Sequence, residues 1–533
     1  MTTPESSVFA RSALRALADA IASGTNPTRW WSDMISPVPL AHRKIFLREL
    51  ANLISKEMRG ISKLAQLLSI DKKRQPGEFD CILYEFLMPL HDLLVTKNFW
   101  EEALNLELTI YTFFIKQDED YVFYENAFSA LYSPYLKIFD DLGIQSSSDY
   151  FTQKINEKNK KKTDGPSSDG PLLFWFQNYS ILAHTQLALD LASHLSAPRK
   201  IYVSALSNAN LEATRSLFSE AGVEILAIDE RKNLSVRCND LVQVCKSKGI
   251  SNIVFVSIPL QSGYIRSICE EIQLTWWSMK YPLGCMRHFD RLVCNRALYP
   301  NKKIFNGAMW YCAPFAVKPI LQSVEKKSIN FSLDDLKIGV LSREEKFASS
   351  DLPEVLHRSL ALNHRFQLFW TGRTHDKNLD HRLHSSLRHA LKNRIHFCGW
   401  VSPAKFLTQI DVLVDTPNLG GMVAYWMMSL GKVVLSATDY GSVGALGSRQ
   451  DIREHFELLT NSDQVRAYFS SASDRPFYLS SADLIPQCIE EYCQNREVLD
   501  EHGRRFLLFF NNVLSDLDSY SRMTYKFLQG QTA

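Results

Sequence analysis

The fold is decided by three apolar runs, Ile395-His-Phe-Cys-Gly-Trp-Val401, Asp411-Val-Leu-Val-Asp-Thr416 and Lys432-Val-Val-Leu-Ser-Ala437. Short apolar runs of this kind are typical of parallel strands that are covered on both faces. The residues between the first two runs predict a short helix. A glycine turn, Pro417-Asn-Leu-Gly-Gly421, and a helix over Met422–Gly431 separate the second run from the third. The stretch therefore predicts alternating strands and helices around a parallel sheet.

The glycine turn is the first candidate for binding. Asn418, Gly420 and Gly421 stand where the second strand is expected to end and the next helix to begin. Glycine lets the backbone approach a ligand closely, and a helix that starts at Met422 offers free N–H groups and the positive end of its dipole. The ligand indicated is an anion, most often a phosphate. The alternative, a tight turn without a ligand, is equally compatible with this stretch.

Length and composition exclude several classes of protein. A chain of 533 residues is too long for one core, so we expect two to four domains. A net charge of +2 argues against binding nucleic acid through bulk charge. No apolar run reaches the roughly 18 residues that a membrane-spanning helix needs.

Cysteine usage and the N-terminus bear on location. The ten cysteines are scattered, and no two form a CxxC pair, so a zinc site is not expected. Most lie in apolar runs, which is typical of free thiols in a reducing compartment. Met-Thr-Thr-Pro-Glu-Ser-Ser at the N-terminus lacks the basic and apolar regions of a secretory signal. We therefore expect a cytoplasmic protein without a zinc site.

Apolar periodicity changes along the chain and predicts an α/β protein of five segments. These are an all-helical N-terminal domain, a polar linker, a first Rossmann-like domain, a second Rossmann-like domain and C-terminal helices: 1–153, 154–171, 172–330, 331–480 and 481–533. Strands separated by helices of 10–15 residues indicate βαβ units and parallel sheets. Two doubly wound sheets in tandem make the cleft between them the default site. The helical domain is expected to cap the site or to bind a protein partner.

Two cations follow the first strand of the second expected sheet. Leu341-Ser-Arg-Glu-Glu-Lys346 places Arg343 and Lys346 directly after a strand end. Arg can clamp a diphosphate with paired hydrogen bonds, and Lys acts as a point charge. A solvated turn is the alternative. The position as well as the residue type favours the phosphate-binding interpretation. The end of the strand at Gly399 is a further place where the backbone can contact a nucleobase.

Candidate residues in the first expected sheet come from two segments. His184 lies in the opening turn of the first helix, where an imidazole can act as a general base. A structural histidine is the commoner case. At the end of a later strand, Trp276, Trp277 and Tyr281 are expected to line an acceptor groove, and Lys280 to offset a phosphate charge. Packing in the core is an equally good interpretation of either tryptophan.

Four stretches together resemble GT-B glycosyltransferases. Within these, the sequence is similar to the O-GlcNAc-transferase clan and to the bacterial cytoplasmic N-glycosyltransferases that modify high-molecular-weight adhesins. The stretches are Pro417-Asn-Leu-Gly-Gly-Met-Val-Ala-Tyr-Trp-Met-Met-Ser-Leu-Gly431, Ser342–Lys346, Ile272-Gln-Leu-Thr-Trp-Trp-Ser-Met-Lys-Tyr-Pro282 and Tyr179-Ser-Ile-Leu-Ala-His184. The resemblance covers roughly residues 170–500. The chain departs from the family in one respect, because no carboxylate that could hold a ribose stands between Pro417 and Gly431.

The resemblance implies an inverting, metal-independent transferase that needs no other cofactor. Its first Rossmann-like domain would be the acceptor side, and its second would bind the nucleotide sugar. Its donor would be a nucleotide sugar, often a UDP-hexose, and its acceptor an Asn or Ser/Thr side chain of a protein such as an adhesin. Two alternatives stay open. One is an enzyme of the same fold that acts on a glycan or a small molecule. The other is a non-catalytic relative that binds a partner, and the missing carboxylate favours it. No Walker, GxGxxG, GxSxG or HExxH sequence is present, which argues against other enzyme classes.

Overall fold

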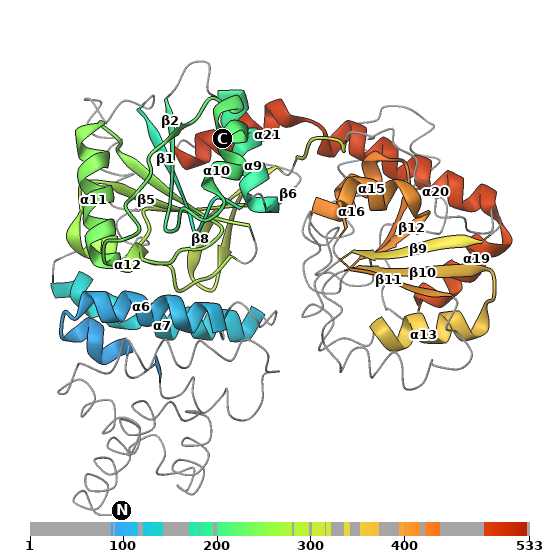
Figure 1. Ribbon diagram of the computed structural model, residues 1–533, viewed down its shortest axis with the longest axis horizontal. Coiled ribbons are helices and arrows are strands. Elements are labelled where there is room, and N and C mark those ends of the chain that lie inside the picture. Colours follow the sequence, from blue (N-terminus) through green and yellow to red (C-terminus); the bar gives the residue numbers. More distant parts are fainter. Residues whose placement is uncertain are drawn as a thin grey trace, which may run out of the picture.

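The computed structural model shows a mixed α/β protein with two largely parallel sheets. It describes residues 87–88, 91–113, 115, 121–141, 170–180, 182–195, 200–279, 282–297, 301–314, 316–320, 335–341, 352–371, 394–399, 401–415, 422–436 and 484–529. The sheets belong to two lobes that lie side by side in Figure 1. We call the eight-stranded sheet and the helices against it the first lobe, and the five-stranded sheet and its helices the second lobe.

The first lobe is built on a sheet of order β3-β2-β1-β4-β5-β6-β8-β7. Its strands are β1 Leu172–Phe176, β2 Ile201–Ala205, β3 Glu224–Ile225, β4 Asn252–Val256, β5 Gln273–Ser278, β6 Arg291–Ala297, β7 Asn301–Phe305 and β8 Ala308–Pro314. All neighbours pair in parallel except β7 and β8. The first six were predicted, although β3 is shorter than expected. The β7–β8 hairpin was not predicted. It turns at Asn306-Gly307, where φ is 46° and 80°.

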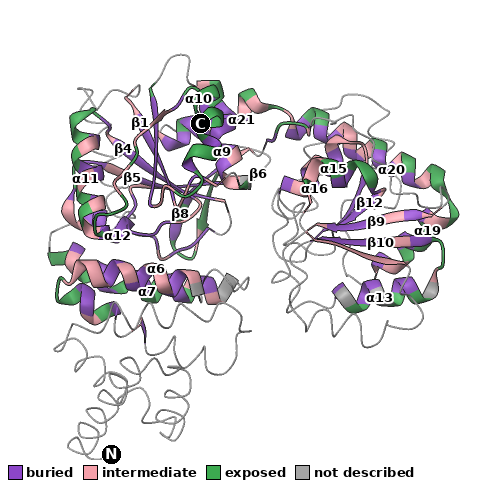
Figure 2. Cartoon of the chain, viewed as in Figure 1, coloured by how far each residue is buried: buried purple, intermediate pink, exposed green. Residues whose placement is uncertain are grey.

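Helices cover both faces of this sheet. They are α9 Ala183–Leu195, α10 Leu211–Glu220, α11 Leu234–Ser247 and α12 Ser262–Ile268. Side chains alternate along each strand, so Phe174 and Phe176 belong to one core while Leu173 and Trp175 belong to the other. All five β1 side chains are therefore buried, and the inner strands are purple in Figure 2. This is the pattern that the apolar runs predict for a sheet between two helical layers.

The second lobe has a sheet of order β11-β10-β9-β12-β13, parallel throughout. Its strands are β9 Leu336–Leu341, β10 Phe366–Thr371, β11 Ile395–Gly399, β12 Val412–Val414 and β13 Val433–Leu435. The helices are α13 Leu352–Leu362, α15 Pro403–Gln409 and α16 Met422–Ser429. All of these elements were predicted. The helices expected over 379–392, 451–459 and 462–471 lie outside the described residues.

Two long helices precede the first sheet. α6 spans Trp100–Phe113 and α7 spans Tyr121–Asp141, and both were predicted as helical. They lie side by side beneath the first lobe in Figure 1, where α6 contacts α11 and α7 contacts α12. Their apolar side chains share a core with one face of the sheet. Most of the expected all-helical segment 1–153 lies outside the described residues.

The C-terminal residues join the two lobes. A single helix was predicted over Arg496–Leu528, but the structure has two helices there, separated by a break. α20, Arg496–Phe509, packs on the second lobe, a π-helical turn follows over Phe510–Leu514, and α21, Leu517–Leu528, packs on the first lobe. The break has a local cause, because the Asp516 carboxylate accepts a hydrogen bond from the Ser519 N–H (3.0 Å) and starts a new helix.

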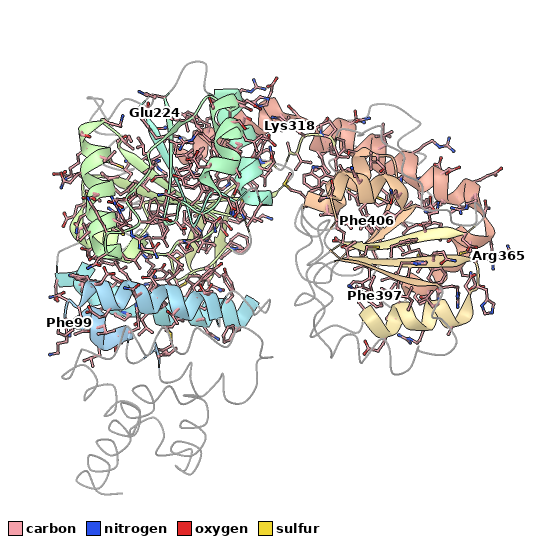
Figure 3. All side chains as sticks on the ribbon, viewed as in Figure 1. Phe99, Glu224, Lys318, Arg365, Phe397 and Phe406 are labelled. Atoms are coloured by element: carbon pink, nitrogen blue, oxygen red, sulfur yellow. The ribbon has the colours of Figure 1, made fainter. Side chains whose placement is uncertain are left out.

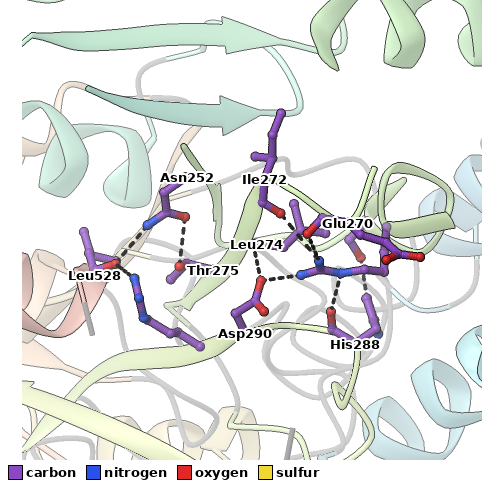
Figure 4. Close-up of polar contacts among 11 residues, drawn as sticks. Asn252, Glu270, Ile272, Leu274, Thr275, His288, Asp290 and Leu528 are labelled. Atoms are coloured by element: carbon purple, nitrogen blue, oxygen red, sulfur yellow. Dashed lines mark hydrogen bonds and ion pairs between the residues drawn. The ribbon is translucent and has the colours of Figure 1, made fainter. Parts of the chain in front are cut away.

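The end of α21 is held at the start of the first sheet. The Leu528 carbonyl accepts hydrogen bonds from the Asn252 side-chain amide (2.9 Å) and from the Arg291 guanidinium (2.8 Å), as Figure 4 shows. Asn252 begins β4 and Arg291 begins β6. A cation at a helix C-terminus also complements the helix dipole. The chain therefore passes from the second lobe back to the first and is fixed there.

Candidate functional site

The carboxyl edge of the second sheet is the candidate site. In open α/β sheets, ligands bind beyond the carboxyl ends of the strands, at the point where the strand order reverses. Here that point lies between β9 and β12, which pair at Val412↔Ile338. In Figure 3, Arg365, just before β10, lies on the far side of the second lobe, and Phe397, in the middle of β11, lies nearer the first lobe. The carboxyl edge of this sheet therefore faces the first lobe.

Gly399 ends β11 at this edge. Its φ is 63°, a left-handed conformation that a side chain disfavours. No heavy atom among the described residues lies within 4 Å of the position that a Cβ would take. A ligand can therefore approach this backbone without meeting a side chain of the described residues. The sequence identified the glycine, and the structure adds its conformation and the space beside it.

Asp415 and Ser436 directly follow β12 and β13, which pair with each other, and sequence reasoning gave neither residue a role. Asp415 follows β12 and is 8% exposed. Its N–H donates to the Leu435 carbonyl (2.9 Å), and the Ser436 hydroxyl donates to its carboxylate (3.4 Å). These bonds fix the chain where it leaves the sheet toward the glycine turn. An acidic residue directly after a buried apolar run is the signal that could have identified Asp415.

Most of the predicted phosphate-binding residues lie outside the described part of the chain. They are Arg343, Lys346, Asn418, Gly420 and Gly421. Their connections are nevertheless defined, since the chain enters residues 342–351 directly from β9 and residues 416–421 directly from Asp415. Met422 begins α16 and is 3% exposed. Its side chain is part of the core, so any contact that it makes with a ligand must come from its backbone.

His184 lies in the first turn of α9, as predicted, and is half-buried. The turn before it is well fixed. The Ser180 N–H donates to the Asn178 side chain (2.9 Å), and the Thr185 hydroxyl donates to the Ser180 carbonyl (2.9 Å). The histidine therefore follows the carboxyl end of β1, after a segment that these two hydrogen bonds hold. Its role as a general base stays a prediction.

The expectation that Trp276 and Trp277 line an acceptor groove is corrected. They are 1% and 0% exposed, because β5 is an inner strand and their side chains enter opposite cores. The Trp276 indole donates to the Ser257 carbonyl (3.2 Å), and the Trp277 indole donates to the Asn295 side chain (2.5 Å). Core packing, the alternative interpretation, is what the structure shows. Lys280 and Tyr281 lie outside the described residues.

The described residues contain neither a candidate metal cluster nor a helix that could span a membrane. No three His, Cys, Asp or Glu side chains in this part of the chain come together in a group that could hold a metal ion. Likewise, none of the helices described here has both the length and the apolar character required to cross a membrane.

No protein-family model and no curated protein matches the sequence. Among solved structures, a mutant of the Thermobaculum terrenum O-GlcNAc transferase is similar over 99% of this chain and 100% of that one, with 14% identity and a TM-score of 0.49. Anabaena HepE in complex with UDP and glucose is similar over 68% of this chain and 100% of that one, with 12% identity and a TM-score of 0.48. A glycosyltransferase from Rickettsia africae is similar over 68% and 99%, with 13% identity and a TM-score of 0.46.

Proposed function

We propose that this protein is an inverting, metal-independent glycosyltransferase that moves a hexose from a UDP-sugar to an Asn or Ser/Thr side chain of a protein. The pairing of β9 with β12 is the observation that supports this proposal most. Both strands lead directly into segments that the sequence marks for phosphate binding, Ser342–Lys346 and Pro417–Gly421. A reversal point with cations on one side and a glycine turn on the other suits a nucleoside diphosphate.

The proposed donor site works by fixed positive charge. Arg343, Lys346 and the N–H groups after Gly420 and Gly421 hold the diphosphate. As the bond from the anomeric carbon to the diphosphate oxygen breaks, its electron pair stays on that oxygen. Cations and helix N-termini that are already in place stabilise this developing charge without a metal. The open space beside Gly399 accommodates the base or the ribose.

The proposed acceptor side belongs to the first lobe. The acceptor nitrogen or oxygen attacks the anomeric carbon from the face opposite the leaving group, so the configuration inverts. His184 takes the proton that the acceptor loses. Its place after the carboxyl end of β1 supports this role, since the corresponding edge is the binding edge of such sheets. The N-terminal helices are then available to contact a protein acceptor or partner.

A transfer assay tests the proposal. The protein is incubated in EDTA with UDP-glucose or UDP-N-acetylglucosamine and a panel of peptides that contain Asn, Ser or Thr. UDP release and a matching mass gain on a peptide are expected. Both should fall at least tenfold in Lys346→Ala and stay unchanged in Lys303→Ala, an exposed lysine of β7. Transfer to glycans alone would assign the acceptor to the alternative class. Absence of binding and turnover with every sugar would favour the non-catalytic relative.

A further inference from the structure

Three glutamates of α6 and α7 bind backbone N–H groups of the first lobe. Glu101 accepts from Leu234 (3.0 Å) and Ser235 (2.9 Å) at the start of α11. Glu125 accepts from the consecutive N–H groups of residues 284 and 285 (3.0 and 3.1 Å). Glu107 accepts from Gln261, just before α12 (2.8 Å). The two helices are therefore docked onto the first lobe at three separate places.

Glu107 differs from the other two because it is fully buried, at 0% exposure. The Tyr132 hydroxyl lies 3.3 Å from one of its oxygens, and the Tyr135 hydroxyl lies 3.4 Å from the other. A buried carboxylate is costly unless several donors satisfy it. The Gln261 N–H and the Tyr135 hydroxyl supply these donors, whereas the single proton of the Tyr132 hydroxyl goes to the nearer Pro259 carbonyl (2.7 Å). The cost of burying the Glu107 carboxyl group suggests that it does more than attach α6 to the first lobe.

The partner of Glu107 is a strained loop at the carboxyl end of β4. Residues 257–261 connect β4 to α12 and begin next to β1, at the reversal point of the first sheet. Ser257 and Gln261 have φ of 69° and 65°, although neither is a glycine. Such residues are uncommon, and they persist only where their surroundings hold them. Strain at a binding edge of the sheet is the usual sign of a positioned loop.

Three elements hold the loop in this conformation. Glu107 of α6 binds the Gln261 N–H, and the Tyr132 hydroxyl of α7 donates to the Pro259 carbonyl (2.7 Å). The Trp276 indole of β5 donates to the Ser257 carbonyl (3.2 Å). Ser257 and Ile258 remain half-exposed at the edge. The loop therefore presents a hydroxyl, an apolar side chain and a fixed backbone beyond β4.

We propose that Glu107 is a positioning residue: through the Gln261 N–H it fixes the 257–261 loop, which forms part of the acceptor-binding wall of the first lobe. The role of the loop in binding an acceptor rests on the proposed function, whereas the fixing of the loop by Glu107 does not. The N-terminal helices then take part in the reaction through the shape of this loop. Glu107 itself does not touch the substrate.

Hydrogen–deuterium exchange of residues 257–265 tests the positioning directly. In Glu107→Ala the exchange of this segment should rise at least tenfold, and Glu107→Gln should restore most of the protection, because its amide oxygen still accepts from Gln261. Glu101→Ala is the matched control, since it releases the start of α11 from the same helix. Tyr132→Phe should also raise the exchange of the loop, and it replaces Glu107→Ala as the test if the alanine variant does not fold. Equal exchange of the loop in wild type, Glu107→Ala and Tyr132→Phe would overturn the inference.

The second readout concerns the acceptor. The KM for a peptide found in the transfer assay should rise at least tenfold in Glu107→Ala, while UDP affinity stays unchanged. A change in exchange without a change in KM would refute the role in acceptor binding. If no UDP binding is found at all, the proposed function fails, and the exchange result still decides whether Glu107 positions the loop.

Discussion

A substitution at Gly399 tests the proposed nucleotide site. Asn tolerates the left-handed conformation better than most residues, and its side chain would enter the open space next to β11. We expect Gly399→Asn to fold with a midpoint of unfolding close to that of wild type and to bind UDP at least tenfold more weakly. Titration calorimetry measures the affinity. Unchanged affinity would mean that the nucleotide does not approach this strand end.

Glu107 makes stability depend on pH in a defined direction. Burial raises the pKa of Glu107 from 4.5 to about 7. Between these values the folded protein holds a proton that the unfolded chain releases, so this residue's contribution to stability falls as pH rises. The free energy of unfolding of wild type, minus that of Glu107→Gln, should fall by about 2 kcal/mol from pH 5 to pH 7.5.

Urea unfolding of both proteins at the two pH values measures this difference. Burial lowers the pKa of the neighbouring His91 and His288 to about 3, and their effect runs the opposite way. Both histidines are present in both proteins, so the comparison isolates Glu107. Parallel pH dependence of the two proteins would contradict the prediction.

Lys432 caps the end of α15 from another part of the chain. Its ammonium donates to the carbonyls of Leu407 (2.9 Å), Thr408 (2.9 Å) and Ile410. Lys432→Met leaves these carbonyls without their donor and should lower the free energy of unfolding by about 2 kcal/mol. Lys526→Met, an exposed lysine of α21, is the control and should change stability by less than about 0.5 kcal/mol. Equal stability of the two variants would show that water replaces the cap.

At the scale of elements, α20 packs closely on the second lobe through a glycine. A Cβ on Gly503 would lie 2.2 Å from the Gly431 carbonyl oxygen, which is backbone and cannot rotate away. Gly503→Ala must displace α20, and we expect it to destabilise the protein by about 2–3 kcal/mol. Arg504→Ala, on the exposed side of the same helix, should have little effect. Thermal unfolding compares the two, and a Gly503→Ala midpoint equal to that of wild type would refute the close contact.

Parallel strands were predictable because a strand that is buried on both faces consists of consecutive apolar residues, as Val412–Val414 does. The edge strand β7, Asn-Lys-Lys-Ile-Phe, carries exposed lysines and so lacks that pattern. The break before α21 was missed because apolar spacing continues through it. At the site, Gly399 was visible as a glycine at a strand end. The partners that bury Trp276 and Trp277 come from distant segments, which a local pattern cannot reveal.

At the scale of the molecule, two passages of chain connect the lobes. The Val317 N–H donates to the Leu514 carbonyl (2.8 Å), so the outward passage and the returning π-helical turn are bound together. Lys318, at the junction in Figure 3, forms an ion pair with the buried Asp190 of α9 (2.8 Å). α9 also carries His184. The helix that bears the proposed base is thus tied directly to the chain that leads to the second lobe.

The most direct test of the central claim is thermal unfolding with UDP, GDP, CMP and ADP in EDTA. A ligand that binds only the folded state stabilises it by mass action, by about 2.7 kcal/mol at 100 times its Kd. UDP should raise the midpoint, the shift should vanish in Lys346→Ala, and it should persist in His184→Ala, because His184 is proposed to act on the acceptor. Absence of a shift with every nucleotide, or an undiminished shift in Lys346→Ala, would contradict a nucleotide site at the reversal point between β9 and β12.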